Sequence, residues 1–440
     1  MKVVLVQVNK KNGIDKTSHP HAGLAYLGAY SLNRGYETIA IDAKYEGIDN
    51  NEVLNRILKI KPFILGLTIR TPDVKECEKI AAIVKNKTPD TKIIVGGAHV
   101  TGIQERVLKE CTYFDIGVIG EGEQTFCELL DMLKSNDSNL QNIKGILYRN
   151  NNNIIKTPSR DYIIDMDSLL FPAWQLFPSG SDITLFTSRG CPFSCSFCQR
   201  VMGQKVRTTS PARVIAEMKR NISDFNATFF QIEDEVFGIN KKWINELLDL
   251  IIKDGINRQV KWIANSRVNV ANIDIYKKMK EAGCIGLGFG VESGNQKILD
   301  SVDKGVTLEQ AYNAINIAKK AGLQTHTFFI LGHPWETKET LRDTINFACK
   351  LNPYSIAFGM MIPYPGTKIH TMAKKGEGGY KGFHEDWELY TKYFGKGLEL
   401  EGLNRSTLER YQKQAYVEFY LRNFRFLDFF KFVFSYLKQK

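Results

Sequence analysis

The sequence predicts an α/β protein in which two successive series of β/α units are followed by a helical C-terminal region. Over residues 1–135, short apolar runs alternate with amphipathic stretches, and a second series of the same kind begins at residue 182. Such alternation is typical of parallel sheets that carry helices on both faces. From about residue 383 the alternation stops and phenylalanines accumulate. The predicted divisions are a doubly wound domain (1–140), a hairpin and linker (141–181), a partial barrel (182–382) and the helical region (383–440).

The composition is that of a soluble globular protein with enough apolar residues for two or three domains. The chain has 440 residues, of which 43% are hydrophobic and 24% are charged. It contains no apolar run of about eighteen residues, and its first residues are typical of a strand and not of a signal peptide. Most of its eight cysteines are expected to be buried, reduced thiols. We therefore expect a cytoplasmic protein.

The formal net charge of +11 is compatible with nucleic acid or an anionic membrane as a partner. The middle of the chain, however, has no basic run with interleaved aromatic residues. We therefore expect no nucleic-acid partner and attribute the charge to a lysine-rich surface.

Five apolar runs in the first domain are predicted to be the strands of a doubly wound, flavodoxin- or Rossmann-like sheet. They alternate with amphipathic stretches whose periodicity predicts helices. In such a sheet the ligand crevice lies at the carboxyl ends of the strands, and glycines follow several of these strands here. The expected strands are 2–8, 37–43, 63–69, 92–97 and 114–120, and the expected helices include 23–35, 74–87 and 123–134.

The second series is predicted to form six β/α units. Six units are too few for a complete eight-stranded barrel, so we expect a partial (β/α)6 barrel with its chemistry at the carboxyl ends of the strands. Before it, the polar segment 149–153 predicts a turn within a small hairpin. The expected strands are 182–188, 227–234, 260–267, 284–293, 325–332 and 355–363.

Three cysteines follow the first of these strands within the segment SRGCPFSCSFCQR (188–200). Cys191, Cys195 and Cys198 have the spacing Cys-x3-Cys-x2-Cys. A structural zinc site needs a fourth ligand, which no nearby cysteine or histidine supplies. A redox pair would need only Cys195 and Cys198. A [4Fe–4S] cluster is ligated by cysteine thiolates, and with three of them it leaves one iron open to a small molecule.

This motif resembles the signature of the radical SAM superfamily, including the aromatic Phe197 before the last cysteine. The resemblance implies that Cys191, Cys195 and Cys198 hold a [4Fe–4S] cluster and that S-adenosylmethionine (SAM) chelates the remaining iron. It also implies that cleavage of SAM yields a 5′-deoxyadenosyl radical, with electrons from a reductant such as flavodoxin or ferredoxin. The cofactors would supply the radical chemistry, and the protein would position and shield them.

The same resemblance implies which strand ends bind SAM. IEDE (232–235) stands where many members carry a Gly-Gly-Glu motif that contacts the methionine ammonium, although the glycines are absent here. A helix N-cap is the alternative role for these acids. NSR (265–267) offers polar groups to SAM, and GVESG (290–294) resembles the segment whose glutamate approaches the ribose. The SAM-binding candidates are Phe197, Glu233, Asp234, Asn265, Ser266, Arg267 and Glu292.

Two later loops, FILGHPWET (329–337) and IPYPGTKI (362–369), resemble loops at the fifth and sixth strands of the same subgroup. They make His333 and Tyr364 candidates for the lining of a substrate cavity. The alternative is that either residue only packs its loop.

The first domain resembles the cobalamin-binding domain found on one radical SAM subgroup. Glycines at strand exits let a bulky ligand approach the backbone. For Glu121 and Glu123 the alternative role is to cap the following helix. The resemblance is carried by PHAGLAYLGAYSLNRGYETIAIDA (20–43), GLTIRT (66–71), VGGAHVT (95–101) and VIGEGEQTFCELL (118–130). The cobalamin-binding candidates are Thr68, Thr71, Gly96, Gly97, His99, Glu121 and Gly122.

One departure from other cobalamin proteins is the absence of the Asp-x-His-x-x-Gly motif, whose histidine ligates cobalt. His19 and His21 precede Gly23 in another pattern. The resemblance therefore implies either cobalamin bound without a histidine ligand or a pocket that has lost it.

Together the two resemblances predict a cobalamin-dependent radical SAM enzyme that transfers a methyl group to an unactivated carbon of a small-molecule or lipid substrate. One alternative is a radical SAM enzyme with a vestigial cobalamin domain that forms a ring or a carbon–carbon bond. A remote alternative is a cobalamin-binding sensor or carrier without enzymatic activity. No catalytic side chain beyond the cofactor ligands is predicted.

The C-terminal segment 407–440 is predicted to be helical, basic and dense in phenylalanine. One interpretation is that it closes the open side of the partial barrel. The other is a basic amphipathic helix that makes peripheral contact with the inner face of the membrane. The second interpretation would favour a lipid substrate.

Overall fold

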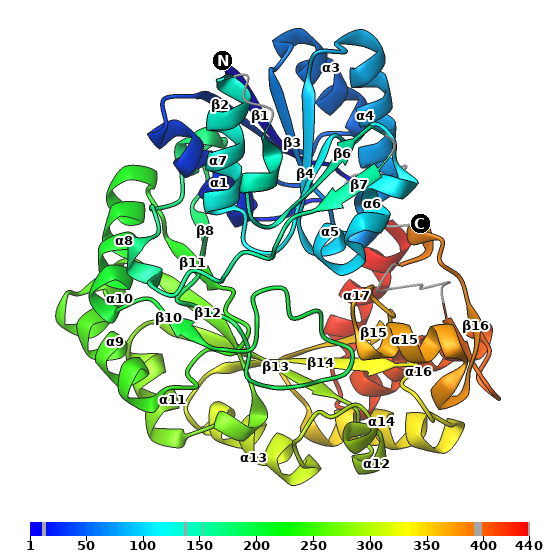
Figure 1. The fold of residues 1–440 in the computed structure, drawn as a ribbon. Coiled ribbons are helices and arrows are strands. Elements are labelled where there is room, and N and C mark those ends of the chain that lie inside the picture. Colours follow the sequence, from blue (N-terminus) through cyan, green and yellow to red (C-terminus); the bar gives the residue numbers. More distant parts are fainter. Residues whose placement is uncertain (11–14, 136–138, 152, 391–397, 439–440) are drawn as a thin grey trace. The chain divides into compact units, whose positions relative to one another are not determined.

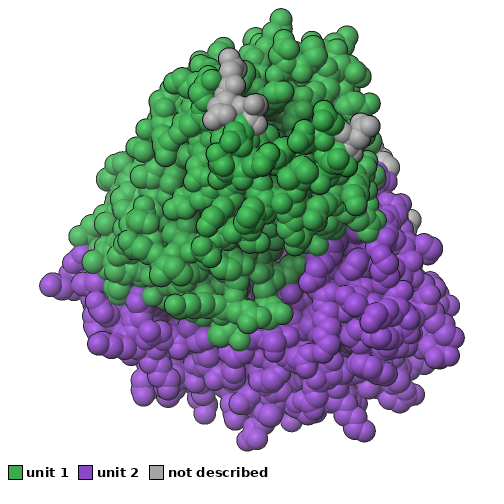
Figure 2. All heavy atoms as spheres, viewed as in Figure 1, with its two compact units in different colours: residues 1–192, 199–234 green, residues 193–198, 235–440 purple. Residues whose placement is uncertain are grey.

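The computed structural model describes residues 1–10, 15–135, 139–151, 153–390 and 398–438. The chain divides into two compact units (Figure 2). Unit 1 contains residues 1–192 and 199–234, and unit 2 contains residues 193–198 and 235–440. The cysteine segment is thus shared, because Cys191 belongs to unit 1 and Cys195 and Cys198 to unit 2.

The first sheet has seven strands in the order β2-β1-β3-β4-β5-β6-β7 (Figure 1). Its first five strands pair in parallel, as predicted, and their apolar side chains are buried as expected for a sheet covered on both faces. The predicted hairpin is present, and it joins this sheet because β6 pairs antiparallel with β5. The strands are β1 (Lys2–Gln7), β2 (Glu37–Asp42), β3 (Ile64–Thr68), β4 (Lys92–Gly96), β5 (Ile116–Val118), β6 (Ile146–Asn150) and β7 (Asn153–Lys156).

The helices of unit 1 follow the predicted rhythm, and α4 and α7 have the predicted bounds. α3 was not predicted, although its start carries a clear signal: the Asp49 side chain accepts hydrogen bonds from the amides of Asn51 and Glu52. The helices are α1 (Ala22–Asn33), α2 (Ala43–Glu46), α3 (Asn50–Ile60), α4 (Val74–Lys87), α5 (Ala98–Ile103), α6 (Glu105–Glu110), α7 (Glu123–Lys134) and α8 (Pro211–Phe225).

The second sheet has six strands in the order β15-β14-β13-β12-β11-β8, one from each predicted β/α unit. β8 pairs in parallel with β11, and β12 to β15 pair in parallel in succession. This is the sheet of a partial barrel, as predicted. The strands are β8 (Asp182–Leu185), β11 (Phe229–Ile232), β12 (Lys261–Ser266), β13 (Cys284–Glu292), β14 (Gln324–Leu331) and β15 (Ser355–Met360).

The two faces of β13 differ sharply. Leu287, Phe289 and Val291 are fully buried on the face covered by helices, where the Phe289 ring lies 6.4 Å from that of Tyr276 in α11. On the opposite face, three consecutive alternate positions, 286, 288 and 290, are glycines. Side chains from neighbouring strands therefore occupy the space above β13 on that face.

The helices of unit 2 have strong starting signals. Thr307 and Thr337 each form a capping box at the start of α13 and α14. No helix of the described residues is long and apolar enough to cross a membrane. The helices are α9 (Lys241–Lys253), α10 (Ile256–Gln259), α11 (Ile273–Glu281), α12 (Gln296–Ser301), α13 (Leu308–Lys320), α14 (Lys338–Leu351), α15 (Lys368–Lys375), α16 (Arg405–Arg422) and α17 (Phe426–Lys438).

The C-terminal region differs from the prediction in two respects. It begins with a two-stranded antiparallel sheet of β16 (Tyr380–Phe383) and β17 (Leu398–Leu400). Its helical part is two helices, separated where Phe424 has a φ of +56°. α16 covers the edge of β15: Gln412 donates to the Phe358 carbonyl at 2.6 Å, and the Phe358 amide donates to the Tyr416 hydroxyl at 3.0 Å. These bonds satisfy the backbone of an edge strand.

The asymmetry of the second sheet can be tested by two phenylalanine truncations. We expect Phe289→Ala to lower the free energy of unfolding by about 3–5 kcal/mol, because it leaves a cavity in the buried face. Phe328→Ala should cost less than about 1 kcal/mol, because that side chain is 43% exposed. Urea-induced unfolding measures both. Equal losses would contradict the assignment of the two faces.

Candidate active site

The three cysteines lie on one loop whose base is a short antiparallel ladder. β9 (Ser188–Arg189) pairs with β10 (Arg207–Thr208), so residues 190–206 form the loop. Gly190 has a φ of +96°, and a Cβ at this position would lie 2.3 Å from the Lys205 carbonyl oxygen. The Cys191 amide donates to the Gly203 carbonyl at 3.1 Å. Only glycine allows the chain to close this tightly beside the first cysteine.

Asp234 secures the strand that leads into this ladder. Its carboxylate accepts hydrogen bonds from the amides of Thr187 and Ser188 at 2.7 and 3.1 Å and from their hydroxyls at 2.5 and 2.7 Å. Burial raises the pKa of Asp234 to about 6, and the four hydrogen bonds oppose that rise. Glu233, beside it, is partly exposed and accepts from the Gln231 amide. Contact of either acid with SAM stays a prediction.

The cysteines differ in their surroundings. Cys191 is partly exposed, Cys195 is buried and Cys198 is exposed. The pKa of the Cys195 thiol is lowered, first by a hydrogen bond from the Cys198 thiol, whose own pKa the same contact raises, and then by the positive charges of Lys304 and Arg267. Arg267 Nη1 lies 3.5 Å from Cys195 Sγ. Since thiolates are the ligand form of cysteine, this environment fits an iron–sulfur cluster.

The cysteines are not assembled into a ligand group, however. Among the described residues, no three or more His, Cys, Asp and Glu side chains are placed together so that they could hold a metal ion. The cysteine spacing and the donor chemistry of thiolates are what support these three residues as cluster ligands.

Two phenylalanines of the loop anchor its second half in unit 2. The Arg267 guanidinium lies 3.8 Å from the centre of the Phe193 ring. Phe197 packs edge-on against His333 at 6.2 Å, and Lys304 Nζ lies 5.8 Å from the Phe197 ring centre. Of these residues, Phe197 and Arg267 were predicted to bind SAM. Their observed contacts place them beside the cysteines.

Glu292 ends β13 in a strained conformation, with a φ of +68°. Its carboxylate is buried and forms an ion pair with Lys304 at 2.8 Å. A Cβ at position 290 would lie 2.2 Å from Glu292 Oε1 and 3.1 Å from Lys304 Nζ, so Gly290 makes the room for this pair. Lys304 was missed by sequence reasoning, because it lies outside every motif.

Asn265 and Ser266 end β12. The Asn265 side chain lies over β13, where a Cβ at position 288 would be 2.3 Å from its Oδ1. Ser266 is buried, and its hydroxyl donates to the Phe237 carbonyl at 3.2 Å. Asn265 is thus available on the glycine face of the sheet, whereas Ser266 has a structural partner. SAM binding by both residues stays a prediction.

The strand exits of the first sheet bring together the candidates Thr68, Thr71, Gly97 and His99. His99 Nδ1 lies 3.1 Å from Thr71 Oγ1, and burial lowers the pKa of His99 to about 3, so its ring is neutral. Gly97, at the end of β4 after Gly96, has a φ of +102°, and a Cβ there would lie 2.9 Å from the Ile69 carbonyl oxygen. This edge is polar but uncharged, and its glycine backbone lets a ligand come close. Both properties fit a bulky corrin ligand.

Two further histidines of unit 1, His19 and His21, contact other groups of the protein. His21 Nδ1 accepts a hydrogen bond from the Leu24 amide and caps α1. His19 Nδ1 lies 3.0 Å from Thr184 Oγ1.

Glu121 and Glu123 do not cap α7, whose N-cap Gly122 makes no side-chain hydrogen bond. Instead they bind two arginines of the β9–β10 ladder. Arg189 donates to Glu121 at 3.1 Å and to Glu123 at 2.7 Å, and Arg207 donates to Glu121 at 2.9 Å. All four side chains are buried and lie in unit 1. We call these four residues the Glu–Arg network; its arginines were missed, although Arg189 stands two residues before Cys191.

His333 and Glu336 lie together in the loop after β14. His333 is fully buried, its Nε2 lies 3.4 Å from the Glu292 carbonyl oxygen, and burial lowers its pKa to about 4. Glu336 accepts hydrogen bonds from the amides of Gly332 and His333. Tyr364 is partly buried, and its ring lies 6.5 Å from that of Tyr390. A role for His333 or Tyr364 in a substrate cavity stays a prediction.

The fold and these residues define a class of protein: a doubly wound domain of corrin-binding type, followed by a partial barrel with three cysteines after its first strand. Comparison with known families agrees. The Radical SAM superfamily matches residues 185–348, and the B12 binding domain matches residues 15–130. The chain belongs to the radical SAM superfamily, in the group that carries a B12-binding domain. It is an enzyme whose cofactors are a [4Fe–4S] cluster, SAM and cobalamin.

Two curated relatives extend over most of the chain. An uncharacterized methyltransferase of Pyrococcus horikoshii is 33% identical over 434 residues, which are 96% of this chain and 93% of the relative. An anaerobic magnesium-protoporphyrin IX monomethyl ester cyclase of Rubrivivax gelatinosus is 31% identical over 385 residues, which are 83% of this chain and 68% of the relative.

Two solved structures share the fold. The radical SAM methyltransferase TsrM from Kitasatospora setae, with cobalamin and a [4Fe–4S] cluster bound, matches with a TM-score of 0.72 and 18% identity over 93% of this chain and 81% of TsrM. The cobalamin-dependent SAM radical enzyme OxsB matches with a TM-score of 0.74 and 18% identity over 96% of this chain and 67% of OxsB.

The buried acid of the loop after β14 gives a prediction about pH. Burial raises the pKa of Glu336 from its ordinary 4.5 to about 8. Between these pH values the folded protein holds a proton that the unfolded chain has released, so this group lowers the free energy of unfolding as pH rises, by at most about 1.4 kcal/mol per pH unit. Glu336→Gln should remove that slope. Urea unfolding of both proteins from pH 5 to 8 measures it, and parallel pH curves would contradict the burial of an uncharged Glu336.

Proposed function

We propose that the protein is a cobalamin-dependent radical SAM methyltransferase that acts on an unactivated carbon. The observation that carries the proposal is the attachment of the cysteine loop to the corrin-type domain through the Glu–Arg network. The cluster with SAM supplies a 5′-deoxyadenosyl radical, and cobalamin supplies the methyl group. Cys191, Cys195 and Cys198 bind the cluster, and Arg267 donates to the Cys195 sulfur. The electrons come from a reductant such as flavodoxin or ferredoxin.

The chain's own residues prepare the site by holding charge in place. The buried ion pair with Lys304 holds the Glu292 carboxylate at the end of β13, and in this proposal that carboxylate accepts hydrogen bonds from the ribose of SAM. Asn265 offers a further polar group on the glycine face of the same sheet. The partly buried rings of Phe193 and Phe197 pack against Arg267 and the buried His333, and Cys195, between these two phenylalanines in the sequence, is 6% exposed.

A second candidate function is ring or carbon–carbon bond formation with an unused cobalamin domain. It is favoured by the similarity to the Rubrivivax gelatinosus cyclase. The two candidates differ in the use of cobalamin, because only the first needs it as the methyl donor.

The cluster assignment is tested by Cys195→Ala, with Cys349→Ala, a buried thiol of α14, as the control. After anaerobic reconstitution, the wild type and the control should contain about four iron atoms per chain and cleave SAM to 5′-deoxyadenosine. Cys195→Ala should lose both properties, since it removes one of three ligands. A Cys195→Ala protein that still cleaves SAM would rule out this site.

Cobalamin dependence separates the two candidate functions. Purified protein offered hydroxocobalamin should acquire a corrin absorbance at one equivalent per chain. It should also transfer a labelled methyl group from SAM to product only in the corrin-loaded form. SAM cleavage without corrin uptake would favour the second candidate.

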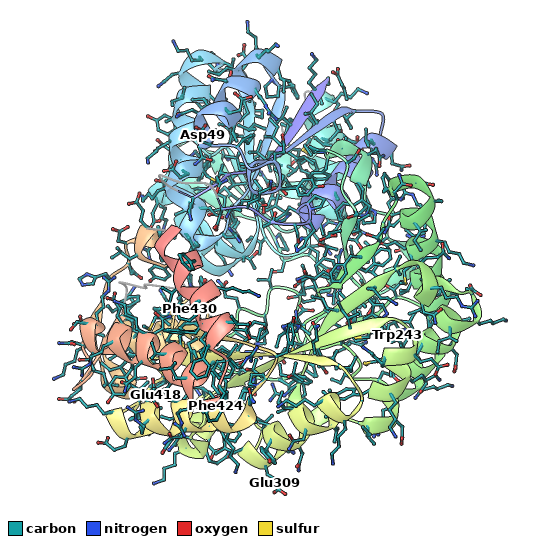
Figure 3. The ribbon with its side chains drawn as sticks, turned by 180° about the vertical axis from the view of Figure 1, so that it is seen from behind. Asp49, Trp243, Glu309, Glu418, Phe424 and Phe430 are labelled. Atoms are coloured by element: carbon teal, nitrogen blue, oxygen red, sulfur yellow. The ribbon has the colours of Figure 1, made fainter. Side chains whose placement is uncertain are left out.

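We further propose that α16 and α17 rest on an anionic membrane surface, which would give access to a lipid substrate. Large apolar side chains are exposed along both helices and at Phe424 between them, and Figure 3 labels Phe424 and Phe430. The exposed apolar residues are Val417, Leu421, Phe424, Phe426, Leu427, Phe430 and Phe434.

The charged residues of α16 and α17 favour an anionic membrane surface as the partner of these helices. The three acids of these helices are already in ion pairs: Glu409 with Arg405, Glu418 with Arg342 and Asp428 with Arg425. The exposed Lys413 and Lys431 add positive charge beside the apolar residues. Apolar burial together with basic side chains is the pattern of interfacial helices.

Vesicle sedimentation tests this contact. The wild type should bind vesicles that contain phosphatidylserine more strongly than phosphatidylcholine vesicles, and salt should weaken the binding. Leu427→Glu/Phe430→Glu should weaken it by about tenfold or more, since two apolar side chains no longer enter the interface. Tyr113→Glu, at a 40% exposed residue of unit 1, is the control. A full-length protein that binds neither vesicle would rule out docking.

A further inference from the structure

We propose that the Glu–Arg network is a positioning device that couples the corrin-binding edge of the first domain to the cysteine loop. The inference rests on the proposed function, because it requires cobalamin at that edge. In this proposal Glu121, Glu123, Arg189 and Arg207 are positioning residues. They act through the backbone of the loop that carries the cluster ligands.

The ladder at the loop base needs these carboxylates. Arg189 and Arg207 are direct cross-strand partners in β9 and β10, and both are about 4% exposed. Like charges directly opposite each other destabilise a strand pair. Two glutamates balance the two guanidinium groups, so the buried cluster carries no net charge.

The carboxylates come from the strand exit where a corrin is expected. Glu121 and Glu123 flank Gly122, directly after β5 and the left-handed Gly120, whose φ is +75°. A change in the backbone at this exit would therefore move both carboxylates.

The arginines lead directly to the cysteine loop on both sides of its base. Arg189 is separated from Cys191 only by Gly190. Arg207 donates to the Met202 carbonyl, within the loop, at 2.8 Å. It also donates to the Ile163 carbonyl at 2.6 Å, while the Ile163 amide donates to Glu121 at 2.8 Å. Together with the backbone of Ile163, the four side chains form a continuous series of contacts from the end of β5 to the cysteine loop.

Removing one charge would destabilise the protein even if the Glu–Arg network had only a structural role. The test must therefore separate an effect on stability from an effect on coupling. Glu123→Gln leaves one excess positive charge, and Arg189→Met leaves one excess negative charge. The double variant Glu123→Gln/Arg189→Met restores neutrality and leaves the pair of Arg207 and Glu121, but it lacks the link from Glu123 to the residue beside Gly190. Glu123→Asp keeps the charge.

The readout is the rate at which reconstituted, anaerobic protein releases iron to a chelator, with and without bound hydroxocobalamin. In the wild type, corrin loading should slow iron release by about fivefold or more, the lower end of ordinary coupling between sites. Glu123→Gln should release iron faster and lose this dependence. The double variant should regain the wild-type iron content and still lack the dependence, and Glu123→Asp should retain part of it.

Glu128→Gln is the matched control, because Glu128 lies on the same helix and pairs with Arg160 at the surface. It should behave as the wild type. A double variant with the full wild-type cobalamin dependence would overturn the coupling. So would a wild type that binds corrin, by absorbance, without a change in its iron release. A wild type that binds no corrin would overturn the proposed function and the coupling with it.

Discussion

Charge balance at the base of the cysteine loop is the constraint on which the rest of the site depends. The ladder that closes the loop sets Arg189 opposite Arg207 in a buried environment. Removing one partner from a buried ion pair costs about 3–5 kcal/mol, so this ladder is stable only with its carboxylates present. Glu121 and Glu123 therefore connect the exit of β5 in the first domain to the start of the loop before Cys191.

The tip of the loop, around Cys195, has a different balance of charge from its base. Cys195 lies close to the positive charges of Arg267 and Lys304, and Lys304 is also paired with Glu292. Such positive charge stabilises thiolates and would stabilise an anionic cluster. The base of the loop is thus neutralised for stability, whereas its tip keeps positive charge for ligand binding. Phe193 and Phe197 hold the tip against these cations.

Sequence predicted the parts of this site that depend on local pattern. Alternating apolar and amphipathic runs located all the parallel strands, and the cysteine spacing located the loop. The partners of Glu121, Glu123 and Asp234 could not be predicted, because each is more than forty residues away in the chain. Lys304 has no motif, and its importance arises from Gly290 making room for it. The break between α16 and α17 depends on one left-handed residue, Phe424, which a helical pattern does not reveal.

The glycine face of β13 explains how one cluster loop could serve different substrates. Gly288 and Gly290 make room for Asn265 and for the pair of Glu292 and Lys304, and a Cβ at position 286 would lie 2.9 Å from His326 Nε2. The free space over this strand is therefore set by side chains from its neighbours. Of these, Asn265 and His326 can change without altering the cysteines or the Glu–Arg network, whereas Lys304 also acts on Cys195. Part of the shape over the sheet is therefore independent of the chemistry on the loop, which fits a fold whose members differ in reaction and substrate while sharing cofactors.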